Sequence, residues 1–301
     1  MTRSGFAAMI GRPNAGKSTL MNQIIGQKIA ITSYKPQTTR TKIRSIYTEE
    51  RGQIVFLDTP GLHRPKNRLG NYMQKASVSS LNEVDVVLLL TAPRPSLSDE
   101  DKEVLDLIRT VKSPVILVIN KIDTVPEKDV AETISMYAET GLFAEIVPVS
   151  ALNGKGVDEL LDCLFKMLPE GPYFYDEDQV TTETQRDIAG ELIREKALLL
   201  LQEEVPHGIA VTVDQMRFRK SASGEDICDI NASIICEKES HKSIVIGRQG
   251  KMLGRIGKAA RLEIEDMLEM KVNLKLYVKV RKDWKDSEIF MKQYGYDAGR
   301  L

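Results

Sequence analysis

Hydrophobic residues form five short, nearly continuous runs in the first half of the chain. The runs are at residues 6–10, 54–58, 84–91, 114–120 and 145–150. They are rich in β-branched residues, as is typical of parallel strands covered on both faces. The segments between them, such as 98–111 and 129–140, have the spacing of helices. This alternation predicts an α/β domain with a mostly parallel sheet and helices on both faces, and a turn at Arg51 and Gly52 predicts one antiparallel edge strand.

The hydrophobic pattern changes in the second half. Residues 186–205 have the spacing of an amphipathic helix, and the period then falls to two over 209–218 and 227–237, which predicts two antiparallel strands. Two helices and a strand are expected to follow, at 241–246, 251–270 and 272–280. The order helix, strand, strand, helix, helix, strand predicts a separate α+β domain.

The segment between the two patterns has the composition of a linker. Residues 168–178 carry two prolines, a glycine and an acidic cluster. We therefore expect a first domain at 1–172, an acidic linker at 173–185 and a second domain at 186–301 that ends in a C-terminal helix. Such a linker would let an event in the first domain alter the placement of the second.

Composition and charge narrow the classes of protein that fit. The 301 residues are 42% hydrophobic, which suits two globular domains. No apolar run approaches the roughly 18 residues of a membrane span and the chain starts without a signal-peptide pattern, so we expect a cytoplasmic protein.

Three cysteines, Cys163, Cys228 and Cys236, are not spaced as metal pairs and are expected to be reduced thiols. The net charge is −1, yet residues 241–285 hold twelve Lys or Arg against five Asp or Glu, which marks a basic region.

A phosphate-binding motif lies near the start. The sequence GRPNAGKS fits G-x-x-x-x-G-K-[ST] and stands between a strand and an apolar helix, which is the context this motif requires. Its glycines let backbone N–H groups face phosphate oxygens, Lys17 can reach the β- and γ-phosphates, and Ser18 can ligate Mg²⁺. The nucleotide contacts expected here are Gly11, Arg12, Pro13, Asn14, Ala15, Gly16, Lys17, Ser18 and Thr19.

Three further motifs at strand ends specify the nucleotide. In DTPG, Asp58 can hold Mg²⁺ through water and Gly61 can donate its N–H to the γ-phosphate. In NKID, the Asp123 carboxylate can accept both N–H groups of guanine, which adenine does not offer, so the nucleotide should be GTP. The backbone of SAL would lie near the guanine carbonyl. The contacts expected from these motifs are Asp58, Thr59, Pro60, Gly61, Leu62, Asn120, Lys121, Asp123, Ser150, Ala151 and Leu152.

The segment SYKPQTTRT, residues 33–41, is expected to order when the γ-phosphate is present and to loosen after hydrolysis; we call it the switch segment. Thr39 is favoured as its Mg²⁺ ligand, with Thr38 as the alternative. Together with Lys17 and Gly61, Thr39 forms the expected catalytic set.

Catalysis by the isolated chain should be slow. Leu62 occupies the position at which many GTPases carry the glutamine that orients the attacking water, so turnover on the order of 10⁻⁴ to 10⁻² s⁻¹ is expected. Asn14 could help to hold K⁺ beside the phosphates, and His63 could position water. A surface role for either side chain stays open.

A second glycine loop lies in the basic region. Gly247-Arg-Gln-Gly250 stands between an apolar helix and an amphipathic one, so a sugar–phosphate backbone could approach closely and meet the N–H groups that open the second helix. This arrangement is typical of the KH clamp, which holds about four nucleotides of single-stranded RNA. The expected RNA contacts are Ile246, Gly247, Arg248, Gln249, Gly250, Lys251, Arg255 and Lys258.

With GRPNAGKS, QTTR, DTPGL, NKID and SAL followed by VIGRQG, the chain resembles the Era family of bacterial ribosome-assembly GTPases over nearly its whole length. The resemblance implies a Ras-like P-loop GTPase domain followed by a type II KH domain. It also implies binding near the 3′ end of small-subunit ribosomal RNA, a role in maturation of the small ribosomal subunit, and peripheral attachment to the inner membrane. The family shares the aliphatic residue at Leu62.

Other classes of protein fit less well. A GTPase of tRNA modification or of another RNA-processing pathway would carry an additional catalytic module, and an RNA-binding scaffold would not need Lys17, Ser18 and Asp58 intact. A membrane-remodelling GTPase would need an insertion segment. We expect GTP, GDP and ribosomal RNA as partners, no DNA, and a monomer.

Overall fold

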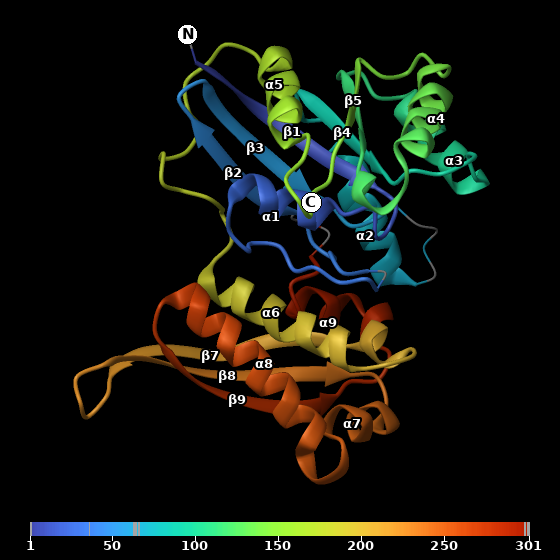
Figure 1. The fold of residues 1–301 in the computed structure, drawn as a ribbon. Coiled ribbons are helices and arrows are strands. Elements are labelled where there is room, and N and C mark those ends of the chain that lie inside the picture. Colours follow the sequence, from blue (N-terminus) through green and yellow to red (C-terminus); the bar gives the residue numbers. More distant parts are fainter. Residues whose placement is uncertain (1, 36, 63–64, 66, 298, 300–301) are drawn as a thin grey trace.

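Two sheets of different construction divide the chain between them (Figure 1). The computed structural model describes residues 2–35, 37–62, 65, 67–297 and 299. A sheet of six strands in the order β2-β3-β1-β4-β5-β6 occupies the amino-terminal half, and a sheet of three strands in the order β7-β8-β9 occupies the carboxyl-terminal half.

The first sheet confirms the predicted α/β domain. Its parallel strands are β1 (Arg3–Gly11), β3 (Gly52–Asp58), β4 (Val86–Thr91), β5 (Val115–Ile119) and β6 (Glu145–Pro148). The strand β2 (Ile43–Glu49) pairs antiparallel with β3 at the edge, as the turn at Arg51 and Gly52 predicted. The helices are α1 (Lys17–Ile25), α2 (Arg68–Ser79), α3 (Asp99–Ile108), α4 (Glu127–Ala138) and α5 (Val157–Met167).

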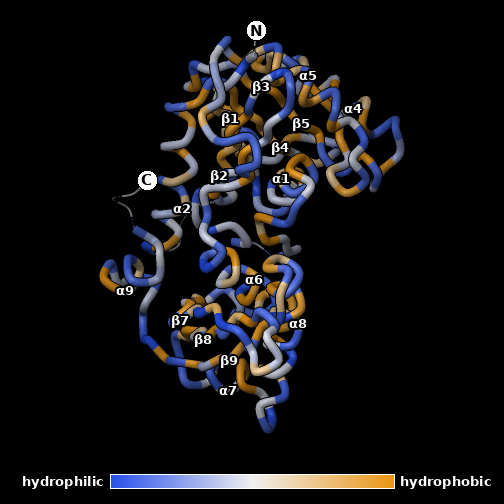
Figure 2. The backbone as a smooth tube through the Cα atoms, turned by 90° about the vertical axis from the view of Figure 1, so that its left-hand side faces the viewer, coloured by the Kyte–Doolittle hydropathy of each residue, from blue (hydrophilic) through white to orange (hydrophobic). Residues whose placement is uncertain are grey.

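Both faces of this sheet are buried, which explains why its central strands β4 and β5 have almost no polar residues. Side chains of α1 and α5, such as Leu20 and Leu160, pack on one face, and those of α3 and α4, such as Leu105 and Tyr137, pack on the other. The continuous hydrophobic strands appear in orange at the centre of the upper lobe in Figure 2. Because parallel strands end at the same edge, the four sequence motifs meet there.

The carboxyl-terminal half has the expected order of elements. It comprises α6 (Gln185–Leu200), β7 (Ala210–Lys220), β8 (Asp226–Cys236), α7 (Glu239–Ile246), α8 (Lys251–Leu268) and β9 (Lys271–Val280). β7 and β8 are antiparallel, whereas β8 and β9 are parallel. The helices cover one face of the sheet and bury a core that includes Ile193, Ile230 and Ile264.

The expected linker is attached to the first domain. Val180 accepts a backbone hydrogen bond from Ile46 in β2, at 2.8 Å, and the Gln53 side chain accepts from the N–H groups of Phe174 and Tyr175. The segment thus covers the open edge of β2, which would otherwise present unpaired backbone groups. Contact between the domains is made elsewhere.

Among the described residues, the domains contact each other directly at residues 28–40 and at α2. At the first, Glu195 of α6 accepts hydrogen bonds from the Thr32 N–H and from Lys28, at 2.8 and 2.7 Å. At the second, residues 284–296, which we call the C-terminal hook, fold back onto α2 (Figures 1 and 2). The hook contains the turn Trp284–Asp286 and the short helix α9 (Glu288–Gln293), where a C-terminal helix was expected.

The three cysteines are thiols, as expected, and burial raises the pKa of Cys236 to about 12. Within the described part of the chain, no helix is both long enough and apolar enough to cross a membrane.

Candidate functional site

The phosphate loop connects β1 to α1. Asn14 and Gly16 have left-handed backbone angles, with φ of 63° and 95°. Gly16 is required because a Cβ there would lie 2.1 Å from the Asn120 side chain. The loop folds around the Lys17 ammonium, which donates to the carbonyls of Gly11 and Arg12 at 3.3 and 3.4 Å. The buried ammonium is therefore held at the start of α1, where backbone N–H groups also favour an anion.

Three side-chain oxygens meet beside this lysine. Ser18 Oγ lies 2.9 Å from Thr39 Oγ1 and donates to Asp58 Oδ2 at 2.9 Å, while Thr39 Oγ1 lies 3.4 Å from the same carboxylate oxygen. All three residues are buried, and Asp58 Oδ1 has no hydrogen-bond partner among the described residues. A set of hard oxygen donors with one buried acceptor left over fits Mg²⁺.

Burial acts on the two charges of this cluster in opposite directions. It raises the pKa of the Asp58 carboxyl, and the Lys17 ammonium opposes that rise. It lowers the pKa of Lys17, and the charge of Asp58 opposes that fall. An opposite charge nearby stabilises the charged form of each buried group. A phosphate group with its metal ion would supply a negative charge for Lys17 and a positive charge for Asp58.

Asn120 connects the guanine motifs to the phosphate loop. Its amide nitrogen donates to the Ala15 carbonyl at 2.9 Å, and its Oδ1 accepts from the N–H groups of Lys121 and Ala151 at 2.8 and 2.9 Å. The Ala151 N–H, which sequence reasoning directed at the guanine carbonyl, thus has a partner within the protein. A buried backbone N–H needs a hydrogen-bond partner, and Asn120 provides it.

The side chains expected at the base lie together. Ser150 Oγ donates to Asp123 Oδ1 at 2.6 Å, and Asp123 is an exposed residue. A hollow of about 500 Å³ opens between α1 and the residues that follow Ser150, namely Ala151 and the exposed Leu152. It meets a second hollow, of about 290 Å³, at Thr19 and Thr32.

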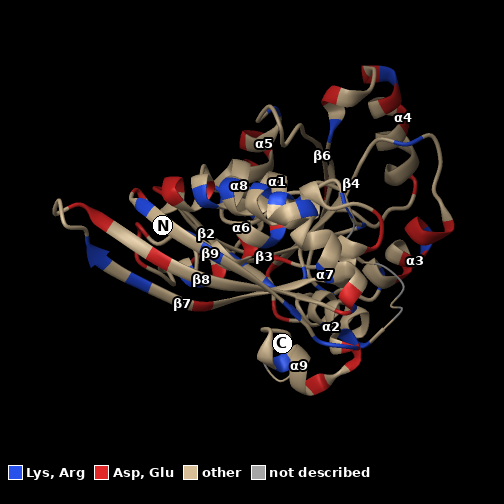
Figure 3. Cartoon of the chain, turned by 90° about the horizontal axis from the view of Figure 1, so that it is seen from below, with Lys and Arg blue, Asp and Glu red and all other residues tan. Residues whose placement is uncertain are grey.

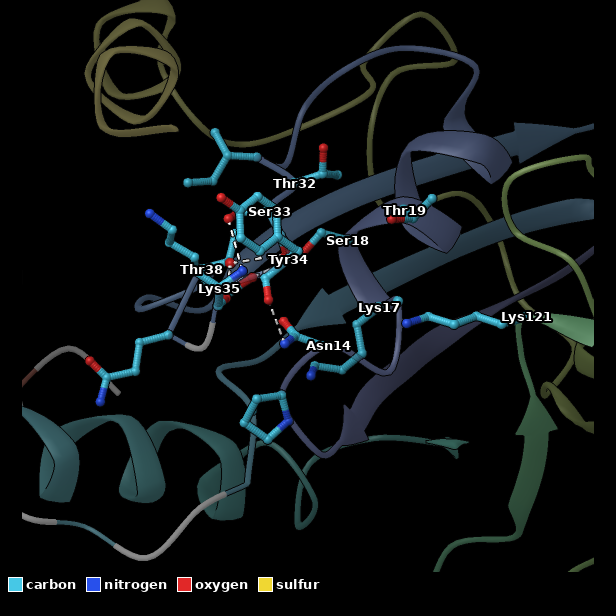
Figure 4. Close-up of a pocket in the computed structure, with 16 residues that line it drawn as sticks. Asn14, Lys17, Ser18, Thr19, Thr32, Ser33, Tyr34, Lys35, Thr38 and Lys121 are labelled. Atoms are coloured by element: carbon cyan, nitrogen blue, oxygen red, sulfur yellow. Dashed lines mark hydrogen bonds between the residues drawn. The ribbon is translucent and has the colours of Figure 1, made fainter. Parts of the chain in front are cut away.

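The smaller hollow lies between the phosphate loop and the switch segment (Figure 4). Asn14 Nδ2 donates to the Tyr34 carbonyl at 2.7 Å across it. Thr38 Oγ1 donates to the Lys35 carbonyl instead, so Thr39 rather than Thr38 lies with Ser18 and Asp58. Sequence reasoning missed several lining residues because only their place in or next to the switch segment marked them: Ile31, Thr32, Ser33, Tyr34, Lys35 and Gln37.

Some expected contact residues turn their side chains away from the hollow. Arg12 pairs with Glu100 at the start of α3. Thr59 donates to the Met9 carbonyl at 2.8 Å, and the Pro60 carbonyl accepts from Ser77. Leu62 packs against the hydrophobic cluster of β1 and β4, while its N–H donates to the Gly11 carbonyl. His63 lies outside the described residues.

The glycine loop of the second domain connects α7 to α8. Gly247, Gln249 and Gly250 have positive φ angles of 69°, 54° and 75°, so the backbone turns sharply before α8 begins at Lys251. Half-buried Ile246 precedes the loop. The basic side chains around it are exposed, and among the described residues none forms an ion pair: Arg248, Lys251, Arg255 and Lys258. Lys and Arg are blue along α8 in Figure 3. This geometry suits a phosphate backbone at the start of α8.

Fold and site together define a P-loop GTPase joined to a KH domain. Residues 6–121 match the family described as 50S ribosome-binding GTPase, and residues 204–285 match the KH domain family. The chain belongs to the Era family of GTPases. GTPase Era of Clostridium novyi is 49% identical over 296 residues, which cover 98% of this chain and 99% of the relative.

Two solved structures agree with the whole arrangement. A point variant of Aquifex aeolicus Era bound to GDP and AlF4⁻ has a TM-score of 0.93 and 38% identity, and the match covers 98% of this chain and all of the other. A structure of Era in complex with MgGDPNP and nucleotides 1506–1542 of 16S ribosomal RNA gives the same score and identity over 99% of this chain and all of that one.

Proposed function

We propose that this GTPase is a GTP-dependent switch that binds the 3′ region of small-subunit ribosomal RNA through its KH domain and assists maturation of the small ribosomal subunit. The domains would be residues 1–172 and 186–301, joined at 173–185. One observation carries the proposal: Thr39 lies against Ser18 and Asp58 while its neighbours Thr38 and Arg40 bond to the second domain. A γ-phosphate that holds Thr39 would thereby fix the KH domain.

The residues of the nucleotide site take the following roles. Lys17 binds the β- and γ-phosphates, Gly61 lies beside the γ-phosphate, and Asp123 accepts the N–H groups of guanine. Ser18 and Thr39 would hold Mg²⁺ directly, and Asp58 would hold it through water. When bound, the ion neutralises charge that develops on the phosphates.

Hydrolysis by the chain alone is slow in this proposal. Leu62 packs into the hydrophobic cluster and has no group that can orient water. A K⁺ ion held by the amide oxygen of Asn14 would supply positive charge near the γ-phosphate, because the amide nitrogen is already committed to Tyr34.

RNA binding is proposed for the loop at Gly247–Gly250 and the four exposed cations beside it. The support is the loop geometry, together with a relative that is structurally similar over its whole length and was solved with a 16S ribosomal RNA fragment. The alternatives are a large-subunit target, as one matched family description suggests, and a tRNA target.

Competition binding separates these targets. A labelled RNA with the sequence of the small-subunit 3′ end should bind the full chain in the presence of a GTP analogue. An equal excess of tRNA or of a large-subunit fragment should not displace it. Displacement by either competitor would contradict the proposed target.

Two finer points belong to the same proposal. The chain would act as a monomer, which light scattering of the purified protein tests. It would also touch the inner membrane peripherally, which sedimentation with vesicles of anionic lipid tests, with neutral vesicles as the control.

A further inference from the structure

The C-terminal hook joins the helix that follows DTPG to the end of the switch segment. Asp286 Oδ1 accepts a hydrogen bond from the Arg68 N–H, the first of helix α2, at 3.0 Å. The carboxylate of one domain thus lies at the positive end of a helix in the other, where negative charge is favoured.

Aromatic packing strengthens the same contact. The ring of Tyr296 meets Tyr72 of α2 edge-on, with centroids 5.9 Å apart, and stacks on Trp284 at 5.8 Å. Trp284 is fully buried and donates from its indole nitrogen to the Gly208 carbonyl at 3.0 Å. With Leu69 and Met73 of α2, these rings form a hydrophobic cluster between the domains.

The hook is also connected to the switch segment through residues 207–209. Arg40, one residue after Thr39, is 1% exposed and donates to the backbone carbonyls of His207 and Ile209 in the KH domain. Tyr296 stacks on Trp284, and Trp284 donates to the carbonyl of Gly208, which lies between the two residues that accept from Arg40. Tyr296 therefore packs both against α2, the helix that follows DTPG, and against the tryptophan that supports the carbonyl acceptors of Arg40.

A shift of α2 would also move the backbone of the phosphate site, because the two are joined by a hydrogen bond. Ser77 of α2 is fully buried and donates to the Pro60 carbonyl at 2.8 Å, and Pro60 precedes Gly61. We propose that Tyr296 and Asp286 are positioning residues for GTP hydrolysis. By fixing α2 and Arg40 relative to each other, they hold Gly61 and Thr39 in the arrangement that the transition state requires. The inference rests on the proposed GTP site and adds the C-terminal hook to it.

Single-turnover hydrolysis and equilibrium GDP binding of the full chain test this role. Tyr296→Ala should lower the hydrolysis rate constant about three- to tenfold, as expected for loss of an aromatic contact that is tightest in the transition state. GDP affinity should change by less than about twofold, because GDP does not need Thr39 or Gly61. Tyr296→Phe keeps the ring and should recover most of the rate.

Asp286 gives a second pair of variants at an exposed contact that does not threaten folding. Asp286→Ala should slow hydrolysis, and Asp286→Asn, which keeps an acceptor for the Arg68 N–H, should recover most of the rate. Ile289→Ser, at a side chain 79% exposed on α9, serves as the matched control and should behave as the parent.

Three outcomes would overturn the inference. The first is parental hydrolysis in both alanine variants, and the second is an equal loss of GDP affinity, which would make the contact merely structural. The third is a parent chain that does not hydrolyse GTP at all, which would remove the proposed function as well. Slow variants of an active parent, rescued by Phe and Asn, would support it.

Discussion

The guanidinium of Arg194 donates a hydrogen bond to the carbonyl oxygen of Thr38, one residue before the threonine that lies against Ser18. Arg194 belongs to α6, which packs on the sheet of the carboxyl-terminal half, and is completely buried, with Glu191 as its charge partner. The second domain therefore contacts the switch segment through a buried side chain that has no access to solvent.

Replacing Arg194 by methionine should weaken binding of GTP without weakening binding of GDP. The change keeps the volume but leaves the Thr38 carbonyl without its donor, at a cost of about 1–2 kcal/mol, or roughly 5- to 30-fold in affinity. In the proposed switch, only a nucleotide that carries a γ-phosphate contacts the ordered switch segment, so GDP affinity should stay the same. Titration with fluorescent GDP and a GTP analogue measures both. Lys128→Met, at an exposed side chain of α4, is the control; an equal loss for both nucleotides would contradict the prediction.

Ser150 donates a hydrogen bond to the Asp123 carboxylate, and the guanine contact proposed for this carboxylate predicts a change of base preference. Asp123→Asn replaces one acceptor by a donor, so GTP affinity should fall roughly 100-fold, as for two charge-assisted hydrogen bonds. Xanthine nucleotides offer a carbonyl at that position and should bind better than guanine nucleotides. Competition between GDP and XDP measures the preference, with Asp129→Asn on α4 as the control. Unchanged GTP affinity would remove Asp123 from the base site.

Potassium dependence tests the role proposed for Asn14. Replacing K⁺ by Na⁺ should slow hydrolysis about tenfold, because a charge that stabilises the γ-phosphate in the transition state is lost. Asn14→Ala should be slow in both salts. Phosphate release at constant ionic strength measures the rates, and equal rates of the parent in K⁺ and Na⁺ would exclude the ion.

Much of the fold could be predicted because its signals are local. The strand that ends at Asp58 is a continuous apolar run, and the edge strand before it is indicated by Gly52 in the turn. Ser98 begins α3 with a capping box that the sequence contains in full. The conformation of the phosphate loop could be predicted from its motif, because only a glycine at position 16 leaves room for the Asn120 side chain.

The contacts between domains could not be predicted in the same way. Tyr296 and Tyr72 are more than 200 residues apart, and Tyr296 belongs to no periodic pattern that points to a partner. The linker's composition predicted a connection through which one domain could alter the placement of the other, and it gave no sign that Val180 pairs with β2, where an edge strand offers unpaired backbone groups. The Arg12 side chain was expected at the nucleotide, but it forms an ion pair with Glu100 at the start of α3.

His207 predicts a pH dependence of stability. Burial lowers the pKa of His207, and the charges of Arg40, Lys35 and Lys285 lower it further, against the effect of Glu204. The folded chain therefore favours the neutral imidazole. The unfolded chain takes up its proton at a higher pH, near the usual pKa of about 6.5, so stability falls as pH drops below that value. Urea unfolding between about pH 7.5 and 5.5 should show this loss, and His207→Gln should reduce it. The same slope in both proteins would contradict the assignment.

Gly250 allows a test of the RNA loop that changes charge alone. The residue has φ of 75° and ψ of 6°, and a Cβ there would meet no atom within 4 Å, whereas at Gly247 it would lie 2.9 Å from the Met252 nitrogen. Asp and Asn tolerate this left-handed conformation similarly and have the same shape, so Gly250→Asn measures the backbone cost. Gly250→Asp adds a negative charge where an RNA phosphate should lie. RNA affinity should fall about 10- to 100-fold more for Asp than for Asn, through like-charge repulsion. GTP hydrolysis by both variants should match the parent. Equal RNA affinity of the two variants would place the RNA elsewhere on the chain.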